Sequence, residues 1–421
     1  MVQSGFQDSN CMTLEKLNDD CLIHIFEFLN KKEKLRIERV SKRWNTLSKL
    51  SWSKINTIAI DPNKKFDGSF FPERKRIVYT NYLIKIFNLS SLYLKKLTLI
   101  LYNARKYLNI YELLENILKT CIHVTHLSIK EDVIKIVTEE YLNNFFKQAS
   151  DLSYISMKGV IVYGNCFMNL KSLKIKELTM HWCEFENFHI IITFIMNLKN
   201  LNYLNIKDEM DIVGRISLAL YHSNCDQLKE ISISLCEYRS LSLFYTFEFF
   251  HKQKDLRVLK LKSVSIDEKL MKLTPKNIEK IDFKFIKEQD NYIILKYLPN
   301  FQSIKIFKCT FEYITDEQFK LFSKSININV ENIDISFIDI LSSNPVTHFS
   351  RLQKLEFFSI NNEYNDGNNE EPLLIDNILN ELLKCKNLKF LQIKNNGLFT
   401  ENILSKFKKM PKFIDTKILK R

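Results

Sequence analysis

One short apolar pattern recurs along most of this chain. It has the form L-x-x-L-x-L, in which L stands for any aliphatic or aromatic residue, and its copies follow one another at intervals that average about 27 residues. A single copy means little, because any amphipathic strand can produce it, but a long series at similar spacing constrains the fold. The copies begin at Leu94, Val124, Leu152, Ile175, Leu201, Leu228, Leu256, Ile278, Phe301, Val330, Leu352 and Leu388.

Each copy predicts a short β-strand whose successive residues face opposite sides. Most of the segments between copies carry apolar residues at helical spacing, as Leu374, Ile378 and Leu382 do. One strand and one helix cannot bury their apolar faces alone, so we expect successive units to stack. The predicted fold class is α/β, a curved solenoid with a parallel sheet on its concave face.

The pattern and its spacing resemble the leucine-rich repeat family, whose repeats span roughly 20–29 residues. Three copies continue to a cysteine eight residues after their first apolar position, namely Cys183, Cys236 and Cys309, and one continues to Asn396. The resemblance is therefore closest to the cysteine-containing variant of the repeat. We interpret these cysteines as turn residues of the repeat core rather than as metal ligands or nucleophiles.

A different module precedes the repeats, and three short helices are predicted in it. Asn18 is placed to cap the first helix, and Asp19 and Asp20 follow in its first turn, where the helix dipole favours acidic groups. Three helices in fewer than 40 residues can build only a small core. Because so many of their residues are large and apolar, we expect a partner protein to cover part of this surface.

This N-terminal segment resembles an F-box, by its apolar spacing and by the run Ser41-Lys42-Arg43-Trp44. It departs from the family pattern at Asn18, where proline is usual, and at Ser41, where cysteine is usual. The resemblance implies docking on the Skp-type adaptor of a cullin ubiquitin ligase. Carried over position by position, the residues that contact the adaptor or form the small core behind it are Leu17, Leu22, Ile25, Phe26, Leu29, Leu35, Val40 and Trp44.

An F-box followed by leucine-rich repeats resembles the F-box/leucine-rich-repeat class of substrate receptors, in which the repeats hold a protein substrate. The expected boundaries are a disordered N terminus at 1–12, the F-box at 13–52, a first strand with a basic linker and capping segment at 53–93, about 12 repeats at 94–400, and a basic C-terminal cap or tail at 401–421.

The sixth position after each copy's first residue is expected on the exposed concave face, and lysine is frequent there. Close positive charges in neighbouring strands favour an acidic or phosphorylated protein segment as the substrate, with phenylalanines as apolar anchors. The alternative is that lysine is simply abundant in this chain and solvates the sheet edge. The candidate substrate-binding residues are Lys130, Lys158, Lys207, Lys262, Lys284, Phe307 and Phe358.

No catalytic motif supports an enzyme. The chain has only seven glycines and no phosphate-binding, nucleophile-elbow or zinc-protease signature, so we expect a non-catalytic protein without a cofactor. His123 and His126 lack the partners of a zinc set, and no metal site is expected. Nine dispersed cysteines, with no signal peptide and no apolar run long enough to span a membrane, favour reduced thiols in the cytoplasm or nucleus.

The net charge of +13 is concentrated near the two ends, at 64–106 and 384–421. Such clusters also suit a basic nuclear protein that binds nucleic acid, but no zinc-finger or RNA-binding motif accompanies them. A second alternative to the ligase receptor is a repeat scaffold whose N-terminal helices bind some partner without ubiquitin transfer.

Overall fold

A computed structural model shows short strands alternating with helices along the chain. It describes residues 14–420 except for 62–72, 103, 105–107, 132–138, 163–173, 186–187, 197, 209, 224, 236–247, 338–346, 363–375, 396–404 and 406–414. The expected disordered start at 1–12 therefore lies outside the described residues. The chain divides into two compact units, Met1–Ser172 and Leu173–Arg421.

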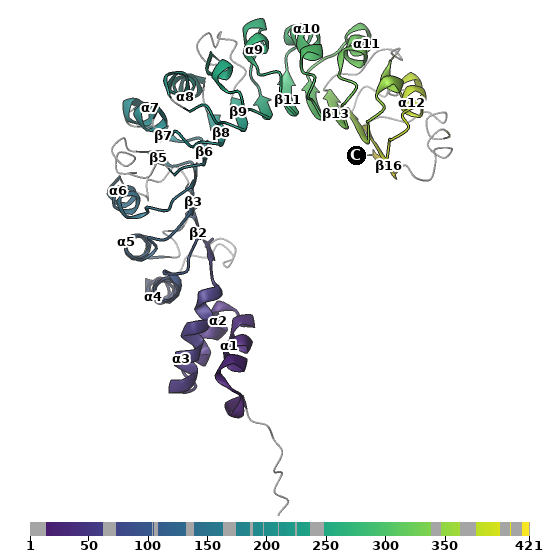
Figure 1. Ribbon diagram of the computed structural model, residues 1–421. Coiled ribbons are helices and arrows are strands. Elements are labelled where there is room, and N and C mark those ends of the chain that lie inside the picture. Colours follow the sequence, from purple (N-terminus) through teal and green to yellow (C-terminus); the bar gives the residue numbers. More distant parts are fainter. Residues whose placement is uncertain are drawn as a thin grey trace, which may run out of the picture. The chain divides into compact units, whose positions relative to one another are not determined.

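The first unit begins with three short helices and continues with parallel strands in the order β1-β2-β3-β4. In Figure 1, α4, α5 and α6 lie on one side of β2 and β3. The elements are η1 (Leu14–Lys16), α1 (Asp19–Phe28), α2 (Lys31–Ile37), α3 (Lys42–Ser51), η2 (Trp52–Lys54), β1 (Thr57–Ile60), α4 (Glu73–Ser90), β2 (Lys96–Ile100), α5 (Ile110–Thr120), β3 (His126–Lys130), α6 (Glu139–Gln148), β4 (Tyr154–Lys158) and β5 (Ile161–Val162).

The second unit continues the alternation, with parallel strands in the order β6-β8-β9-β10-β11-β12-β13-β14-β15-β16. Its elements are β6 (Glu177–His181), β7 (Glu184–Phe185), α7 (Phe188–Met196), β8 (Tyr203–Asp208), α8 (Met210–His222), β9 (Glu230–Leu235), η6 (Glu248–Lys252), β10 (Val258–Lys262), α9 (Glu268–Leu273), β11 (Lys280–Ile286), α10 (Glu288–Tyr297), η7 (Leu298–Asn300), β12 (Ile306–Phe311), α11 (Asp316–Ser325), β13 (Asn332–Phe337), η8 (Phe349–Arg351), β14 (Phe357–Asn362), α12 (Asp376–Leu382), β15 (Phe390–Asn395) and β16 (Asp415–Lys420).

Within the second unit, the strands line the inner side and the helices α8 to α12 cover the outer side (Figure 1). The apolar positions of the repeat fill the space between these two layers. In the repeat that begins at Leu256, for example, Leu256, Leu259 and Leu261 are at most 1% exposed. From α11, Phe319 and Phe322 are fully buried against the same core. This is the strand-and-helix arrangement that the spacing predicts, and the predicted α/β leucine-rich-repeat fold is confirmed.

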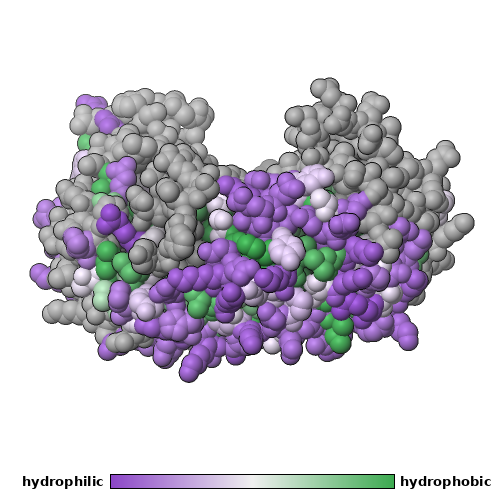
Figure 2. Space-filling model, turned by 90° about the horizontal axis from the view of Figure 1, so that it is seen from above, coloured by the Kyte–Doolittle hydropathy of each residue, from purple (hydrophilic) through white to green (hydrophobic). Residues whose placement is uncertain are grey.

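The described surface is correspondingly polar. On the face seen in Figure 2, hydrophilic residues predominate and apolar residues are seen in small groups. Every one of the twelve predicted repeat strands is present, from β2 to β15. One further strand, β16, lies within the segment expected to form the C-terminal cap or tail and pairs in parallel with β15. Within the segment expected as a basic linker, residues 73–90 form α4.

The predicted register is wrong in two repeats. Phe307 and Phe358 were expected on the exposed face, but both are fully buried. Phe307 pairs with Ile281 and Ile333 of the neighbouring strands, which are themselves core residues. In each of these repeats an additional apolar residue lies three positions before the first residue of the pattern that the structure adopts. The L-x-x-L-x-L pattern therefore fits the sequence in two registers. Because side chains alternate with period two, a slip of three residues reverses which face each one takes.

The cysteines also differ from the prediction. Cys309 lies inside β12, opposite Phe283 and Ile335, and is a strand core residue rather than a turn residue. Cys183 does follow β6 at a turn, where it is buried. Cys236 lies outside the described residues. None of the cysteines that the structure describes forms a disulfide, namely Cys21, Cys121, Cys183, Cys225, Cys309 and Cys385.

The corrected register makes a testable prediction at two adjacent positions. Phe307→Ala should lower the free energy of unfolding by about 3–5 kcal/mol, because it removes a large side chain from a filled core. Ile306→Ala, one residue away on the half-buried opposite face, should cost about 1 kcal/mol or less. Urea unfolding of both variants measures this difference, and equal losses would contradict the register.

Candidate functional site

The three N-terminal helices begin at polar side chains that cap them. Asn18 accepts a hydrogen bond from the backbone N–H of Cys21 at the start of α1. Asn30 and Glu33 form a reciprocal capping box at the start of α2. Ser41 accepts from the N–H of Trp44 at the start of α3. Such caps fix where each helix begins, which matters in a module whose helices have ten residues or fewer.

A small apolar core joins α1 to α3. Leu22, Phe26 and Leu47 are buried in it, and the rings of Phe26 and Trp44 meet with centroids 5.2 Å apart. The partly buried residues packed against this core are Leu17, Ile23, Leu29, Ile37 and Trp44. Five of these positions were predicted from the sequence, namely Leu17, Leu22, Phe26, Leu29 and Trp44. Together the core residues hold the helices in place, with Leu22, Phe26 and Leu47 buried and the others partly exposed.

Other predicted adaptor positions are exposed. Ile25 is 39% exposed and Val40 is 56% exposed, whereas Leu35 is 9% exposed. The structure thus separates the eight predicted residues into core and surface. Sequence reasoning missed Phe28, which is 79% exposed and follows Ile25 by one helical turn. Its place at i+3 from Ile25 was the available signal.

Exposed residues of α1 form a second apolar stripe on that helix. Cys21, Ile25 and Phe28 are spaced i, i+4 and i+7, so they share one side of the helix beside the core-facing side. The ring of His24 meets Phe28 edge-on, with centroids 5.0 Å apart. Exposed apolar stripes of this kind on small modules commonly mark protein interaction sites.

Arg43 of α3 holds in place the residues that lead into α1. Its guanidinium donates to Asp19 Oδ1 through Nε at 2.9 Å and through Nη2 at 2.7 Å. It also donates to the carbonyl oxygens of Glu15 and Leu17, each at 2.6 Å. A charged, planar side chain from α3 therefore holds the segment before α1, where the F-box family usually has a proline and this chain has Asn18.

Two charged residues, Lys34 in α2 and Glu38 at its end, connect this helix to neighbouring segments. Lys34 is 2% exposed and donates from Nζ to the carbonyl oxygen of Ser51 at 2.8 Å. Burial lowers the pKa of Lys34, and the nearby Glu27 opposes that change. Glu38, at the end of α2, accepts from Lys85 Nζ of α4 at 2.7 Å. The N-terminal helices are thus joined to the first repeat helix by a partly buried ion pair.

Within each unit the predicted lysines lie in one column at the carboxyl end of the strands, here called the edge column. In the first unit, Lys130 pairs with Lys158 and with Ile100. In the second unit, Lys262 pairs with Lys284. The strand pairings place the following residues in the edge column: Ile100, Lys130 and Lys158 in the first unit; His181, Lys207, Ser234, Lys262, Lys284, Thr310, Ser336, Asn361 and Lys394 in the second.

Charges are distributed differently in the column two residues earlier, here called the central column. There Lys260, Asp282, Lys308 and Asp334 alternate along β10 to β13. Lys308 Nζ lies 3.0 Å from Asp334 Oδ2, and Lys260 Nζ lies 2.5 Å from Glu230 Oε1. Lys260 and Lys308 are therefore neutralised within the sheet.

Two lysines of the edge column, Lys207 and Lys262, have aromatic neighbours instead. Lys207 Nζ lies 4.0 Å from the ring centroid of Trp182, and Lys262 Nζ lies 5.0 Å from that of Phe285. Trp182 and Phe285 have positive φ angles of 51° and 55°, so each ring is set by a left-handed backbone position. Within the described part of the chain, no carboxylate forms a salt bridge with Lys207, Lys262 or Lys284. The edge column of the second unit is therefore a net positive surface beside one exposed aromatic ring, Trp182, and one half-buried ring, Phe285.

Among the described residues we find neither a cluster suited to a metal ion nor a helix suited to crossing a membrane. No group of three or more His, Cys, Asp or Glu residues among those positions could hold a metal ion. No helix in the described ranges has both the length and the apolar character needed to cross a bilayer.

Comparison with known proteins identifies the N-terminal module. The family model described as the F-box domain matches residues 14–56, which contain all three helices and their caps. No curated protein sequence gives a significant match to the chain. The N-terminal module is therefore an F-box domain.

Solved structures similar to this chain at low sequence identity include two neighbours of different origin. An internalin from Listeria monocytogenes has a TM-score of 0.41 at 11% identity, covering 96% of this chain and 95% of that chain. The Rad7 and Elc1 complex from yeast has a TM-score of 0.48 at 14% identity, covering 81% of this chain and 78% of that chain. Because both scores are below 0.5, the fold assignment rests on the repeats themselves. The chain has an F-box domain followed by leucine-rich repeats, which is the architecture of the F-box/leucine-rich-repeat class.

The buried ammonium of Lys34 makes a prediction about alkaline pH. Its folded-state pKa lies below the usual 10.5, so the folded chain releases this proton before the unfolded chain does. The free energy of unfolding of the wild type, relative to Lys34→Met, should therefore increase as pH rises from 7 towards 10.5. Tryptophan fluorescence follows this unfolding, since Trp44 and Trp52 both lie in the F-box helices. Lys49→Met, at an exposed position of α3, is the control, and a pH-independent difference for Lys34→Met would contradict the assignment.

Proposed function

We propose that this chain is the substrate-recognition subunit of an SCF-type cullin ubiquitin ligase. In this proposal the F-box docks on a Skp-type adaptor, through it on a cullin, and the leucine-rich repeats hold a protein substrate. The observation that carries the proposal is the F-box match at residues 14–56, joined to a repeat solenoid in one chain.

The adaptor surface that we propose is the exposed apolar part of the F-box. Ile25 and Phe28 on α1, with Val40 before α3, present large apolar side chains that the domain does not bury itself. Leu22, Phe26 and Trp44 contribute from behind by holding the helices in place. Exposed aromatic and aliphatic side chains of this kind are typical anchors of protein interfaces.

The substrate surface that we propose is the edge column, with Lys130 and Lys158 in the first unit and Lys207, Lys262 and Lys284 in the second. Neighbouring parallel strands lie about 4.8 Å apart, which is within a Debye length, so adjacent ammonium groups act together on one ligand. An acidic or phosphorylated segment of a protein substrate matches this charge. Trp182 and Phe285 replace the two buried phenylalanines as apolar contacts beside the lysines.

Such a receptor acts by proximity and forms no covalent intermediate of its own. Binding a substrate and the adaptor at once raises the local concentration of substrate lysines near the ubiquitin-conjugating enzyme. The structural requirement is that the two binding surfaces belong to one polypeptide and do not overlap. In this chain one surface lies on the helices before residue 54 and the other on the repeat strands.

Capture of the adaptor tests the first half of the proposal. The full chain should co-purify with a Skp-type adaptor, and Ile25→Asp combined with Val40→Asp should weaken that capture at least about tenfold, because a carboxylate is forced into an apolar contact. Both positions are exposed, so circular dichroism should show an unchanged fold. Tyr292→Asp on α10, which replaces a side chain that is 61% exposed, is the matched control and should capture the adaptor normally.

A wild-type chain that captures no Skp-type adaptor would contradict this function. Capture of the adaptor without a cullin would instead indicate a scaffold that does not take part in ubiquitin transfer.

Charge reversal tests the second half. Lys207→Glu, Lys262→Glu and Lys284→Glu together should remove acidic or phosphorylated clients from affinity captures, while the adaptor is retained. The control carries the same change in net charge at exposed positions away from the edge column, with Lys254→Glu, Lys276→Glu and Lys320→Glu. Quantitative mass spectrometry of both captures gives the comparison, and an unchanged client set would show that the edge lysines only solvate the sheet.

A further inference from the structure

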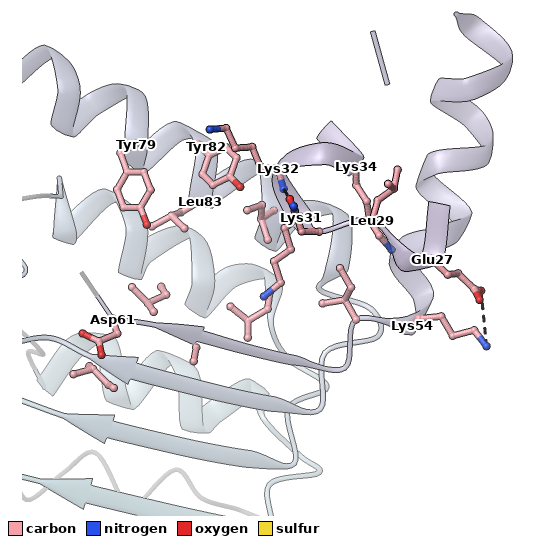
Figure 3. Close-up of a pocket in the computed structure, with 17 residues that line it drawn as sticks. Glu27, Leu29, Lys31, Lys32, Lys34, Lys54, Asp61, Tyr79, Tyr82 and Leu83 are labelled. Carbon is pink, nitrogen blue, oxygen red and sulfur yellow. Dashed lines mark hydrogen bonds and ion pairs between the residues drawn. The ribbon is translucent and has the colours of Figure 1, made fainter. Parts of the chain in front are cut away.

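Strand β1 stands at one end of the strand order and has a neighbouring strand on only one side. It pairs in parallel with β2, and no other strand of the described ranges lies along its second side. A cavity of about 760 Å³ lies beside β1, and Ile58, Ala59 and Ile60 are part of its lining. In Figure 3, the labelled residues of α2 and α4 lie on the side of β1 that is away from the other strands.

The backbone of this sheet edge is unpaired at two residues. The N–H of Lys96 in β2 donates to the carbonyl of Asn56 at 2.9 Å, so Asn56 and every second residue after it face β2. The intervening residues, Thr57 and Ala59, direct their N–H and C=O groups to the other side, where no described residue donates to them or accepts from them. Both residues are exposed, so two backbone donors and two acceptors are open to a partner.

The cavity beside this edge has apolar walls. Ile58 and Ile60 are each 3% exposed, and Leu83 and Ile86 of α4, which line the same cavity, are 7% and 3% exposed. A strand added in phase with β1 would turn every second side chain towards this apolar layer and the others towards the inner face of the sheet. Apolar residues at alternate positions of that strand would then be buried, while its polar residues stay in water.

The walls of the cavity favour a narrow occupant. Residues from the end of α1, the start of α2 and helix α4 all line it, so the edge of β1 lies in a recess between helices. A single extended chain needs only about 4.8 Å in the plane of the sheet and can enter such a recess. A small molecule lacks donors and acceptors at the spacing of a strand, and a second folded copy would bring its own α2 and α4 against these helices.

We propose that β1 binds an extended segment of a partner protein, which adds a parallel strand to the sheet and carries apolar residues at every second position. Main-chain hydrogen bonds to Thr57 and Ala59 supply affinity, and the apolar cavity selects the side chains. This surface is separate from the exposed stripe on α1 and from the edge column of the second unit. The proposal goes beyond the ligase function, because it holds whether or not the chain binds a Skp-type adaptor.

A peptide copied from the chain's own β3 tests this in the full chain. The peptide of residues 125–131 is a strand that already stacks in this sheet, and in phase with β1 its Leu127 and Ile129 correspond to Ile58 and Ile60. A fluorescein-labelled copy should bind the wild type saturably, which fluorescence anisotropy measures.

Ala59→Pro removes one outward N–H without touching the hydrogen bonds to β2, because proline is tolerated where the N–H of an edge strand faces solvent. It should weaken peptide binding by about tenfold or more, since a backbone carbonyl of the peptide loses its donor. Ala59→Ser keeps the N–H at the same exposed position and is the matched control, expected within about twofold of the wild type. Circular dichroism of both variants checks the fold.

A second measurement leaves the protein unchanged. In β3 the N–H of Glu131 donates to the carbonyl of Lys158 in the next strand, so the N–H groups of residues 127 and 129 face the next strand as well. N-methylation of the peptide at residues 127 and 129 should therefore abolish binding to β1. N-methylation at residues 128 and 130 should change the affinity by no more than about threefold, because those groups face away from β1.

The proposal is overturned if the wild type shows no saturable binding, or if Ala59→Pro and Ala59→Ser bind the peptide equally. Equal effects of the two methylated peptides would also overturn it. A second copy of this chain is the competing occupant, and sedimentation of the full chain tests it: a wild-type dimer that Ala59→Pro converts to a monomer would replace the partner segment with self-association.

Discussion

The structure depends on a single constraint, which is that every strand must present the same alternate residues to the helices. In a parallel stack each strand is paired on both sides, so its phase is shared with its neighbours through the hydrogen-bond ladder. Ile281 stands between Leu259 and Phe307, and Phe307 stands between Ile281 and Ile333. A strand out of phase would expose its own core residues and bury polar ones against the next repeat. This shared phase is why a short apolar pattern, repeated often enough, determines an entire solenoid.

The same constraint creates the surfaces that can bind partners. Once the inward-facing positions are committed to the core, the residues between them are forced onto the inner face in straight columns, at one strand spacing. A column can then bring together functional side chains that no local cluster in the sequence could provide, because its members come from repeats more than twenty residues apart. The F-box is constrained instead by the small size of its core. Its helix α1 has apolar residues on two sides, and the core is large enough to bury only one of these sides.

The repeat fold could be predicted from the sequence, because the apolar pattern is periodic and each copy supports the strand register of its neighbours. The predictions failed where periodicity left two solutions, at the repeats containing Phe307 and Phe358, and tertiary pairing chose between them. The spacing of apolar residues on α1 predicted which residues lie in the core or contact a partner. It did not show that Leu22 is buried and Ile25 exposed, because this depends on where Leu47 and Trp44 of α3 pack. The cavity beside β1 was invisible to sequence reasoning, because its walls come from segments that are brought together only by folding.

The contrast between the two inner-face columns argues that lysine abundance alone does not explain the edge column. If lysines were distributed over the sheet merely because the chain is rich in them, carboxylates would be expected beside them in both columns to similar degrees. Instead the central column alternates Lys260, Asp282 and Lys308, while the edge column places Lys207 and Lys262 over aromatic rings. The left-handed backbone at Trp182 and Phe285 is a turn feature of the repeat, because Gly159 and Ser263, which hold no ring, have positive φ angles at the same position. The rings beside Lys207 and Lys262 therefore follow from which residue stands at that position, and not from a backbone conformation found only there.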